Sequence, residues 1–192
     1  FQRVVNDLTD YITTNNKTED FIKNHDIETV IEFGCGDGNQ LSMTEFPSYI
    51  GLDVSPTAIQ MCMEKFEDDD SKSFFLYDSE SFVDNHGIFD ADLGISLDVI
   101  YHLTEDYIYH KYMEDLFSSS EKYVIIYSAN TTETYVTAEH VKHRKFTNWV
   151  ENNATDWELS EVIDNKYPYD PSDPENTSWS DFYIFKNTSH QS

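Results

Sequence analysis

The sequence is short of positively charged residues. Lysine and arginine number 12 against 37 aspartates and glutamates in 192 residues, so the formal net charge is 12 − 37 = −25. Nucleic acids and anionic membranes select surfaces dense in Lys and Arg, so we expect neither as a partner. The imbalance is typical of a halophilic source, where salt screens self-repulsion, and an ordinary acidic cytoplasmic protein is the open alternative.

Long apolar runs and cysteines are also scarce. No run of about 18 apolar residues occurs, which predicts no membrane-spanning helix, and no secretory signal stands near Phe1. The chain does not begin with Met, so we expect the protein to begin upstream. Two cysteines, Cys35 and Cys62, are too few for a disulfide framework and favour a cytoplasmic protein with reduced thiols. No His, Cys and Asp cluster has metal-ligand spacing, so we expect no metal.

Aromatic residues are plentiful and predict an ordered domain. The mean hydropathy of −0.59 is typical of disordered chains, but aromatic residues make up 15% of the sequence, far more than solvated tails carry. The size is that of one domain, residues 1–192.

Strand-like and helix-like segments alternate through most of the chain. Helical spacing is present at residues 3–24, 55–66 and 104–117, and β-rich runs at 29–33, 49–54, 73–77, 90–97 and 122–127. This alternation predicts a parallel sheet with helices on both faces. A short helix at 146–152 and two strand-like runs at 157–163 and 179–185 predict an antiparallel hairpin at the end of the sheet.

Two helix starts carry capping signals. Ser55 followed by Pro56 is the order of an N-cap residue and a first-turn proline. Thr104 stands before acidic residues at the start of the 104–117 segment, which predicts that it caps that helix.

Half of the six glycines fall in one loop. Gly34, Gly36 and Gly38 directly follow the first expected strand, where glycine allows a tight turn and a close approach of a ligand to the main chain. Asp53 ends the second expected strand, beside that loop in a parallel sheet, and its carboxylate can accept hydrogen bonds from the two hydroxyls of a ribose. The combination predicts a nucleoside-binding site, and a tight turn without a ligand is the alternative.

With these motifs, residues 28–130 resemble the class I S-adenosylmethionine-dependent methyltransferases. The resemblance rests on V-I-E-F-G-C-G-D-G-N (30–39), Y-I-G-L-D-V-S (49–55), Asp78 and D-A-D-L-G-I-S-L-D-V-I-Y-H-L (90–103). It implies a Rossmann-like α/β three-layer sandwich, with a mostly parallel seven-stranded sheet and a C-terminal antiparallel hairpin. It also implies a helical cap at 1–27, a cofactor-binding core at 28–130, and an acceptor-side and hairpin region at 131–192.

The same resemblance implies the cofactor and the reaction. S-adenosyl-L-methionine would donate its methyl group to a small-molecule acceptor, at an oxygen. The acids of the glycine loop, Glu32 and Asp37, suit a sulfonium and an ammonium group better than the pyrophosphate of NAD.

The implied cofactor contacts follow the carboxyl ends of the strands. Asp53 would bind the ribose, Val54 would pack on the adenine, and Asp78 would face the adenine amino group with Ser79 beside it. The full implied set is Glu32, Gly34, Cys35, Gly36, Gly38, Asp53, Val54, Asp78, Ser79, Ser96 and Leu97. A core position for Val54 and a turn position for Asp78 are the alternatives.

Acceptor contacts are expected after the fourth and fifth strands. His102 is the candidate general base, because its ordinary pKa suits proton removal near neutrality, and bonding to backbone is its alternative role. Tyr101, His143 and Arg144 are the candidate acceptor contacts. Arg144 lies among three cations within residues 142–145, which favours an anionic acceptor, or else pairing with the acidic surface. The tail resembles small methyltransferases of glycan-modifying pathways, which implies a sugar as the other acceptor.

Three other functions stay open on the sequence. An NAD-dependent oxidoreductase is disfavoured by the acidic loop and by the lack of a suitably placed Tyr-x-x-x-Lys pair. A non-catalytic nucleoside-binding module would keep Asp53 and the glycines but lack an acceptor pocket. A protein or nucleic-acid methyltransferase is disfavoured by the charge and by S-L-D-V in place of N-P-P-Y after the fourth strand. The oligomeric state is left open.

Overall fold

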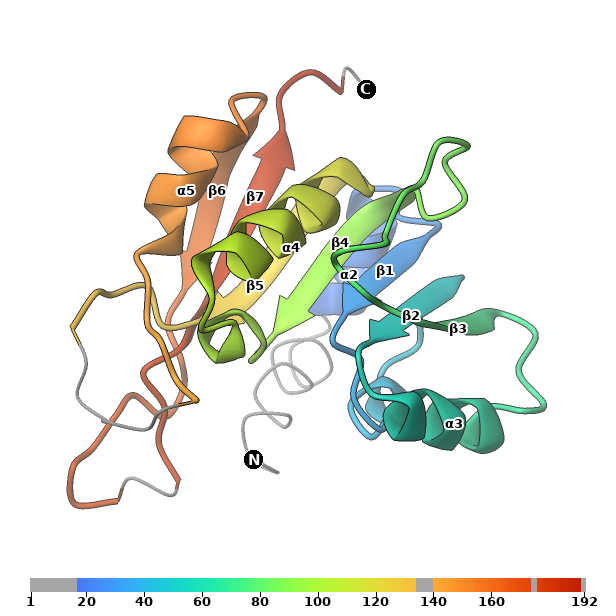
Figure 1. The fold of residues 1–192 in the computed structure, drawn as a ribbon, viewed down its shortest axis with the longest axis horizontal. Helices are drawn as coiled ribbons and strands as arrows, with labels where there is room; N and C mark the ends of the chain where they lie inside the picture. Colours follow the sequence, from blue (N-terminus) through green and yellow to red (C-terminus); the bar gives the residue numbers. More distant parts are fainter. Residues whose placement is uncertain (1–16, 134–139, 174–175, 191–192) are drawn as a thin grey trace.

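The fold is built on one seven-stranded sheet. The structure is a computed structural model that describes residues 17–133, 140–173 and 176–190. The strands are β1 (Val30–Phe33), β2 (Tyr49–Asp53), β3 (Lys72–Leu76), β4 (Ala91–Leu97), β5 (Ser120–Ser128), β6 (Trp157–Ile163) and β7 (Asp181–Asn187). They lie in the order β3-β2-β1-β4-β5-β7-β6 (Figure 1). The first five run parallel, and β7 pairs antiparallel with both β5 and β6. The expected α/β fold with a mostly parallel sheet is confirmed.

Helices cover both faces of this sheet. They are α2 (Lys17–Asn24), α3 (Pro56–Lys65), α4 (Asp106–Ser118) and α5 (Phe146–Asn153), with short 3-10 turns η2 (Leu41–Met43) and η3 (Ile100–His102). In Figure 1, α4 and α5 lie in front of the sheet and α2 lies behind it. One apolar core joins the sheet to α4 and α5, and a second joins it to α2 and α3. Of the helix expected over residues 3–24, residues 1–16 lie outside the described residues.

Strand β5 shows why the sequence of a central strand is apolar at almost every position. Val124 and Ile126 belong to the core under α4 and α5, whereas Tyr123 and Tyr127 belong to the core on the opposite face. Successive side chains of a strand point to opposite faces, and here both faces are covered, so polar alternation is absent.

The two expected helix caps have different outcomes. The Ser55 hydroxyl accepts a hydrogen bond from the Ala58 N–H at 3.3 Å, and Pro56 opens α3, as expected. The expectation for Thr104 is wrong: α4 begins at Asp106, and its N-cap is Glu105, which makes no side-chain capping bond. The guanidinium of Arg144 binds the carbonyl of Thr104 at 3.1 Å, which holds that residue in the preceding loop.

The sheet order places two loops side by side at its carboxyl edge. The chain leaves β1 toward β2 on one side, while β4 lies on the other side of β1. A crevice forms where the direction of winding reverses in this way, and α/β proteins bind ligands there. The loop after β1 contacts the loop after β4 so closely that a Cβ on Gly34 would stand 2.4 Å from Val99 Cγ2.

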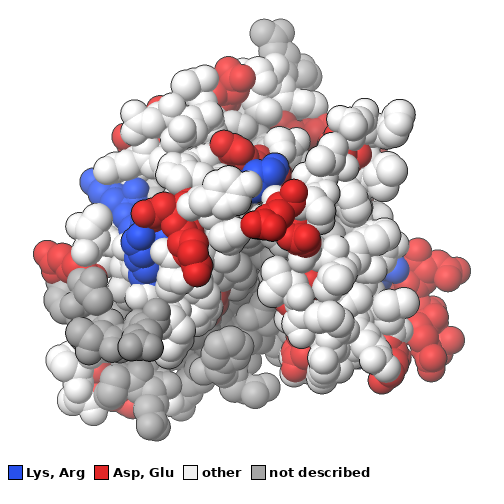
Figure 2. All heavy atoms as spheres, viewed as in Figure 1, with Lys and Arg blue, Asp and Glu red and all other residues white. Residues whose placement is uncertain are grey.

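The surface carries few free cations in the part of the chain that the structure describes. On the face shown in Figure 2, the blue Lys and Arg side chains lie beside red carboxylates. Ion pairs are formed by Lys72 with Asp69, Lys111 with Asp115, Lys122 with Asp92, and Lys142 and Arg144 with Asp106. Within the described ranges, none of the helices is both long enough and apolar enough to pass through a membrane.

Candidate active site

A cavity of about 500 Å³ opens at the carboxyl ends of β1, β2 and β4. Of the expected cofactor residues, its wall contains Gly34, Cys35, Gly36, Asp53, Val54 and Ser79, and Leu97 lies at the end of β4. Three carboxylates, those of Asp37, Asp53 and Asp98, line the cavity. No Lys or Arg stands among the described residues of its wall, so the cavity favours a ligand group with positive charge.

The glycine loop has backbone torsion angles that are unfavourable for residues with a side chain. Gly34, Gly36 and Gly38 have φ values of +88°, +57° and +71°, in the left-handed region that glycine enters without strain. A Cβ on Gly38 would stand 2.8 Å from Phe66, whereas a Cβ on Gly36 would meet nothing within 4 Å. The loop is therefore closed on its protein side and open at Gly36, as a cradle for a ligand requires.

Asp53 joins the glycine loop to the next helix. One oxygen accepts a hydrogen bond from the Gly36 N–H at 2.9 Å, and the other accepts one from the Ser55 N–H at 2.8 Å. Each carboxylate oxygen has a second lone pair, so Asp53 can still accept hydrogen bonds from a ligand in the cavity. Val54, beside it, is 70% exposed at the cavity wall, which excludes the core position that the sequence left open.

Glu32 is placed behind the loop and does not line the cavity. Its side chain is buried in β1, and the Tyr49 hydroxyl donates to Oε2 at 2.6 Å. Oε1 has no hydrogen-bond partner among the described residues. Burial raises the pKa of Glu32 to about 7, against the opposing effect of the bond from Tyr49.

Three more of the expected cofactor residues also lie off the cavity wall. Asp78 is exposed and accepts bonds from the Glu80 N–H at 3.0 Å and from the Ser81 hydroxyl at 2.9 Å, which is the turn position that the sequence left open. The hydroxyl of Ser96 is buried, 2.7 Å from that of Tyr112. Gly38, in the loop itself, faces the side chains of Phe66 and Cys62.

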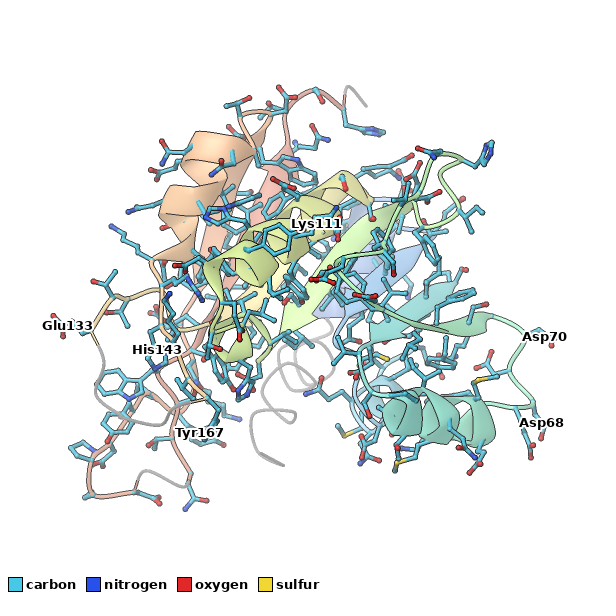
Figure 3. The ribbon with its side chains drawn as sticks, viewed as in Figure 1. Asp68, Asp70, Lys111, Glu133, His143 and Tyr167 are labelled. Carbon is cyan, nitrogen blue, oxygen red and sulfur yellow. The ribbon has the colours of Figure 1, made fainter. Side chains whose placement is uncertain are left out.

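On the acceptor side, His102 lines the cavity and is exposed. Its Nδ1 lies 3.3 Å from the carbonyl oxygen of His140, so the bond requires the proton on Nδ1 and leaves Nε2 as an acceptor. The ring centre of Tyr101 lies 4.3 Å from that of His102, with the rings tilted by 51°, and 6.1 Å from that of His143. Neither Tyr101 nor His143 is part of the cavity wall. Figure 3 shows His143 on the segment that precedes α5.

Arg144 binds groups of the protein itself. Its guanidinium donates to the carbonyls of Leu103 at 2.7 Å and Thr104 at 3.1 Å, pairs with Asp106 at 2.9 Å, and lies 4.3 Å over the Tyr109 ring. The structure therefore places Arg144 against the loop before α4, and not in the cavity where an anionic acceptor would bind.

Comparison with known proteins gives one relative by sequence. No protein-family model matches the chain. A small RNA 2′-O-methyltransferase of Arabidopsis thaliana is 33% identical over 96 residues, which cover 44% of this chain and 10% of that protein. The aligned part thus represents a tenth of the relative.

Solved structures match over most of the chain. The methyltransferase domain of bacterial CtHen1 superposes with a TM-score of 0.67 at 19% identity, over 90% of this chain and 95% of that one. The magnesium protoporphyrin IX methyltransferase of Synechocystis, with bound S-adenosylhomocysteine, gives 0.67 at 13% identity over 97% and 83%. The N-methyltransferase NodS of Bradyrhizobium japonicum gives 0.65 at 16% identity over 84% and 78%. The chain has the S-adenosylmethionine-dependent methyltransferase fold.

Within this methyltransferase fold, the cavity wall includes residues that the sequence did not single out. The Tyr77 hydroxyl donates to buried Asp115 at 2.8 Å, and Asp115 pairs with Lys111 of α4, labelled in Figure 3. The Tyr112 hydroxyl donates to the Phe33 carbonyl at 2.9 Å. A helical period across α4 marks Tyr112 as buried, but no local signal shows that it reaches the cavity.

Asp98 is a further residue of the cavity wall that the sequence did not assign. It directly follows β4, at the carboxyl edge where the methyltransferase fold binds its ligands. Its place after a strand was a usable signal in the sequence. The described residues contain no group of three or more His, Cys, Asp and Glu side chains placed to hold a metal ion.

Proposed function

We propose that this chain is an S-adenosylmethionine-dependent methyltransferase that acts on a hydroxyl oxygen of its acceptor. The observation that carries the proposal is the position of Asp53 at the cavity wall, its two oxygens held by the N–H groups of Gly36 and Ser55. A carboxylate oriented in this way suits the two hydroxyls of a ribose.

The charge of the cavity supports the methyl donor over a dinucleotide. The donor carries a sulfonium and an ammonium group against a single carboxylate, so its net charge is positive, whereas NAD carries a pyrophosphate. Three aspartates line the cavity, and the described wall residues include no Lys or Arg. The open space at Gly36 leaves room for the donor against the main chain.

The residues of this chain position the two reactants and keep water out of the cavity. When bound, the cofactor supplies an electrophilic methyl group for in-line displacement. Buried Leu97 and the rings of Tyr77 and Tyr112 form an apolar side of the cavity, which excludes water and holds donor and acceptor close together. An acceptor hydroxyl also needs a group that takes its proton, and the Nε2 of His102, at the cavity wall, is one candidate.

For the acceptor, we propose a small molecule with a hydroxyl group. The absence of cations from the described cavity wall and the engagement of Arg144 favour a neutral acceptor over an anionic one. A second candidate is the ribose 2′-hydroxyl of an RNA. It is favoured by the Arabidopsis relative, which is a small RNA 2′-O-methyltransferase, and it is opposed by the net charge of −25.

Calorimetry tests the cofactor. We expect S-adenosylmethionine and S-adenosylhomocysteine to bind, and NAD and NADP not to bind. Binding of NAD or NADP without binding of either methionine nucleoside would refute the proposal and restore the oxidoreductase.

A labelling assay tests the acceptor. The protein is incubated with donor carrying a radioactive methyl group and a hydroxyl panel of phenol, glucose, adenosine, a short RNA and its 2′-deoxy counterpart. We expect label in a small member of the panel. Label in the RNA that disappears with the 2′-deoxy counterpart establishes the second candidate instead. Donor binding without label in any member points to the non-catalytic module.

A further inference from the structure

Asp98 has a left-handed backbone conformation, which is uncommon for residues other than glycine. Its φ is +59°, in the left-handed region that residues with a Cβ avoid. Asp26 has a similar φ of +49°, but it is exposed and follows the end of α2, where chains commonly turn left-handed. Asp98 instead directly follows β4, where its N–H donates to the Tyr127 carbonyl at 3.0 Å.

This conformation presents a half-buried carboxyl group to the cavity. Asp98 lines the cavity wall, and the Tyr101 hydroxyl donates to its carboxylate. Burial raises the pKa of Asp98 to about 6, with the bond from Tyr101 acting in the opposite direction. The carboxylate is thus charged near neutrality and close to the pKa at which a group accepts protons efficiently.

The position of Asp98 relative to the glycine loop follows from its neighbour. Val99 packs on Gly34, so the segment 97–99 forms the part of the cavity wall beside the loop that would hold the donor. An acceptor that enters the cavity next to this loop would meet Asp98. With a left-handed backbone, a carboxylate partly shielded from solvent and a place on the cavity wall, the residue has the properties of a functional group.

We propose, resting on the methyltransferase function above, that Asp98 is the catalytic base that receives the acceptor's proton. The acceptor hydroxyl would donate a hydrogen bond to the Asp98 carboxylate. As the oxygen–methyl bond forms, the sulfur–methyl bond breaks and its electron pair stays on sulfur, while the hydroxyl proton passes to Asp98. The protonated Asp98 then returns the proton to water.

Other titratable groups surround Asp98 and define the alternatives. Tyr101 of η3 and Tyr127 of β5 lie behind it, and Asp37, Asp53 and His102 share the cavity wall. Burial raises the pKa of Tyr101 well above its ordinary value, so it stays protonated and remains a donor. His102 is the competing base, and it differs from Asp98 in being exposed.

The test is Asp98→Asn, with Asp26→Asn as a matched control. Asparagine tolerates the left-handed backbone and keeps the shape of the side chain, but it cannot take a proton. With the panel member that the wild-type protein labels most strongly, we expect kcat to fall by about a hundredfold or more. Calorimetric affinity for the donor and the melting temperature should be unchanged. The same change at exposed Asp26 should leave all three quantities unchanged.

A second variant separates a catalytic role from a structural one. Tyr101→Phe removes the hydrogen bond that lowers the pKa of Asp98, so the acidic limb of the pH profile of kcat should move to higher pH. Asp98→Asn with kcat within about threefold of wild type overturns the role, as does an acidic limb unmoved by Tyr101→Phe. Wild-type protein that binds no methionine nucleoside would contradict the proposed function itself.

Discussion

Asp53 accepts a hydrogen bond from the Gly36 N–H at 2.9 Å, across the ends of two neighbouring strands. Its other oxygen accepts one from the Ser55 N–H at 2.8 Å, so a single carboxylate orders both the glycine loop and the entry to α3. The residue proposed to bind the ribose is therefore also a structural support of its own site, and its loss should affect binding and stability together.

Replacement of Asp53 tests this double role. We expect Asp53→Ala to weaken S-adenosylmethionine binding by about 1–3 kcal/mol, since charged hydrogen bonds are lost, and to lower the melting temperature. Asp53→Asn keeps one carbonyl oxygen for one of the two N–H groups, so its effect should lie between wild type and Ala. Calorimetry and thermal unfolding of the three proteins give the order, and equal affinities in all three would exclude Asp53 from the cofactor site.

Gly34 and Gly36 offer a matched pair within the loop. Both have positive φ, so an alanine at either position costs about 1–2 kcal/mol of backbone energy. Gly34→Ala also forces a Cβ to within 2.4 Å of Val99 Cγ2 and should destabilise the fold more. Gly36→Ala places its Cβ in open space, so it should weaken donor binding more than it weakens the fold. Denaturant unfolding and calorimetry measure the two effects, and an inverted order would contradict the proposed position of the donor.

Arg144 should prove structural. Arg144→Ala leaves the carbonyls of Leu103 and Thr104 without their donor, and we expect a loss of about 1–3 kcal/mol in the free energy of unfolding. Lys142→Ala is the control, because Lys142 pairs with the same Asp106 but is more exposed, and its loss should be clearly smaller. Urea titrations compare the two variants. A large rise in KM for the acceptor with unchanged stability would instead return Arg144 to the acceptor site.

Glu32 should make the stability of the fold depend on pH. Its folded-state pKa of about 7 lies above the value of 4.5 expected in the unfolded chain, so the folded protein holds the proton more tightly. The stabilisation that this bound proton gives the folded state is complete below about pH 4.5, and it is lost as the pH rises toward 7. Relative to Glu32→Gln, the free energy of unfolding of wild type should fall over that window, whereas exposed Glu67→Gln should show no such trend. Parallel curves for wild type and Glu32→Gln would refute the assignment.

The net charge of −25 predicts a response to salt. Carboxylates such as Asp68 and Asp70 project from the loop after α3 into solvent (Figure 3), and added salt screens their mutual repulsion. We expect the melting temperature to rise with potassium chloride between dilute and molar concentration. A flat or falling curve would remove the halophilic interpretation and leave the fold unaffected.

Much of the fold was accessible from the sequence because the signals are local. Apolar runs such as residues 122–127 and the alternation of strands with helices depend on neighbouring positions, and so does the Ser55 cap. The glycine loop and Asp53 were also predictable as partners, because parallel strands bring their carboxyl ends to the same edge.

Tertiary structure alone decided the roles that depend on distant contacts. From the sequence, Arg144 is predicted to bind an anionic ligand. In the folded chain its guanidinium instead binds the carbonyls of Leu103 and Thr104, about forty residues earlier. The position of β7 between β5 and β6, and the left-handed turn that aims Asp98 at the cavity, have no periodic signature. Local patterns report which face of an element is buried, whereas these roles depend on which distant backbone groups remain to be satisfied once the elements have packed.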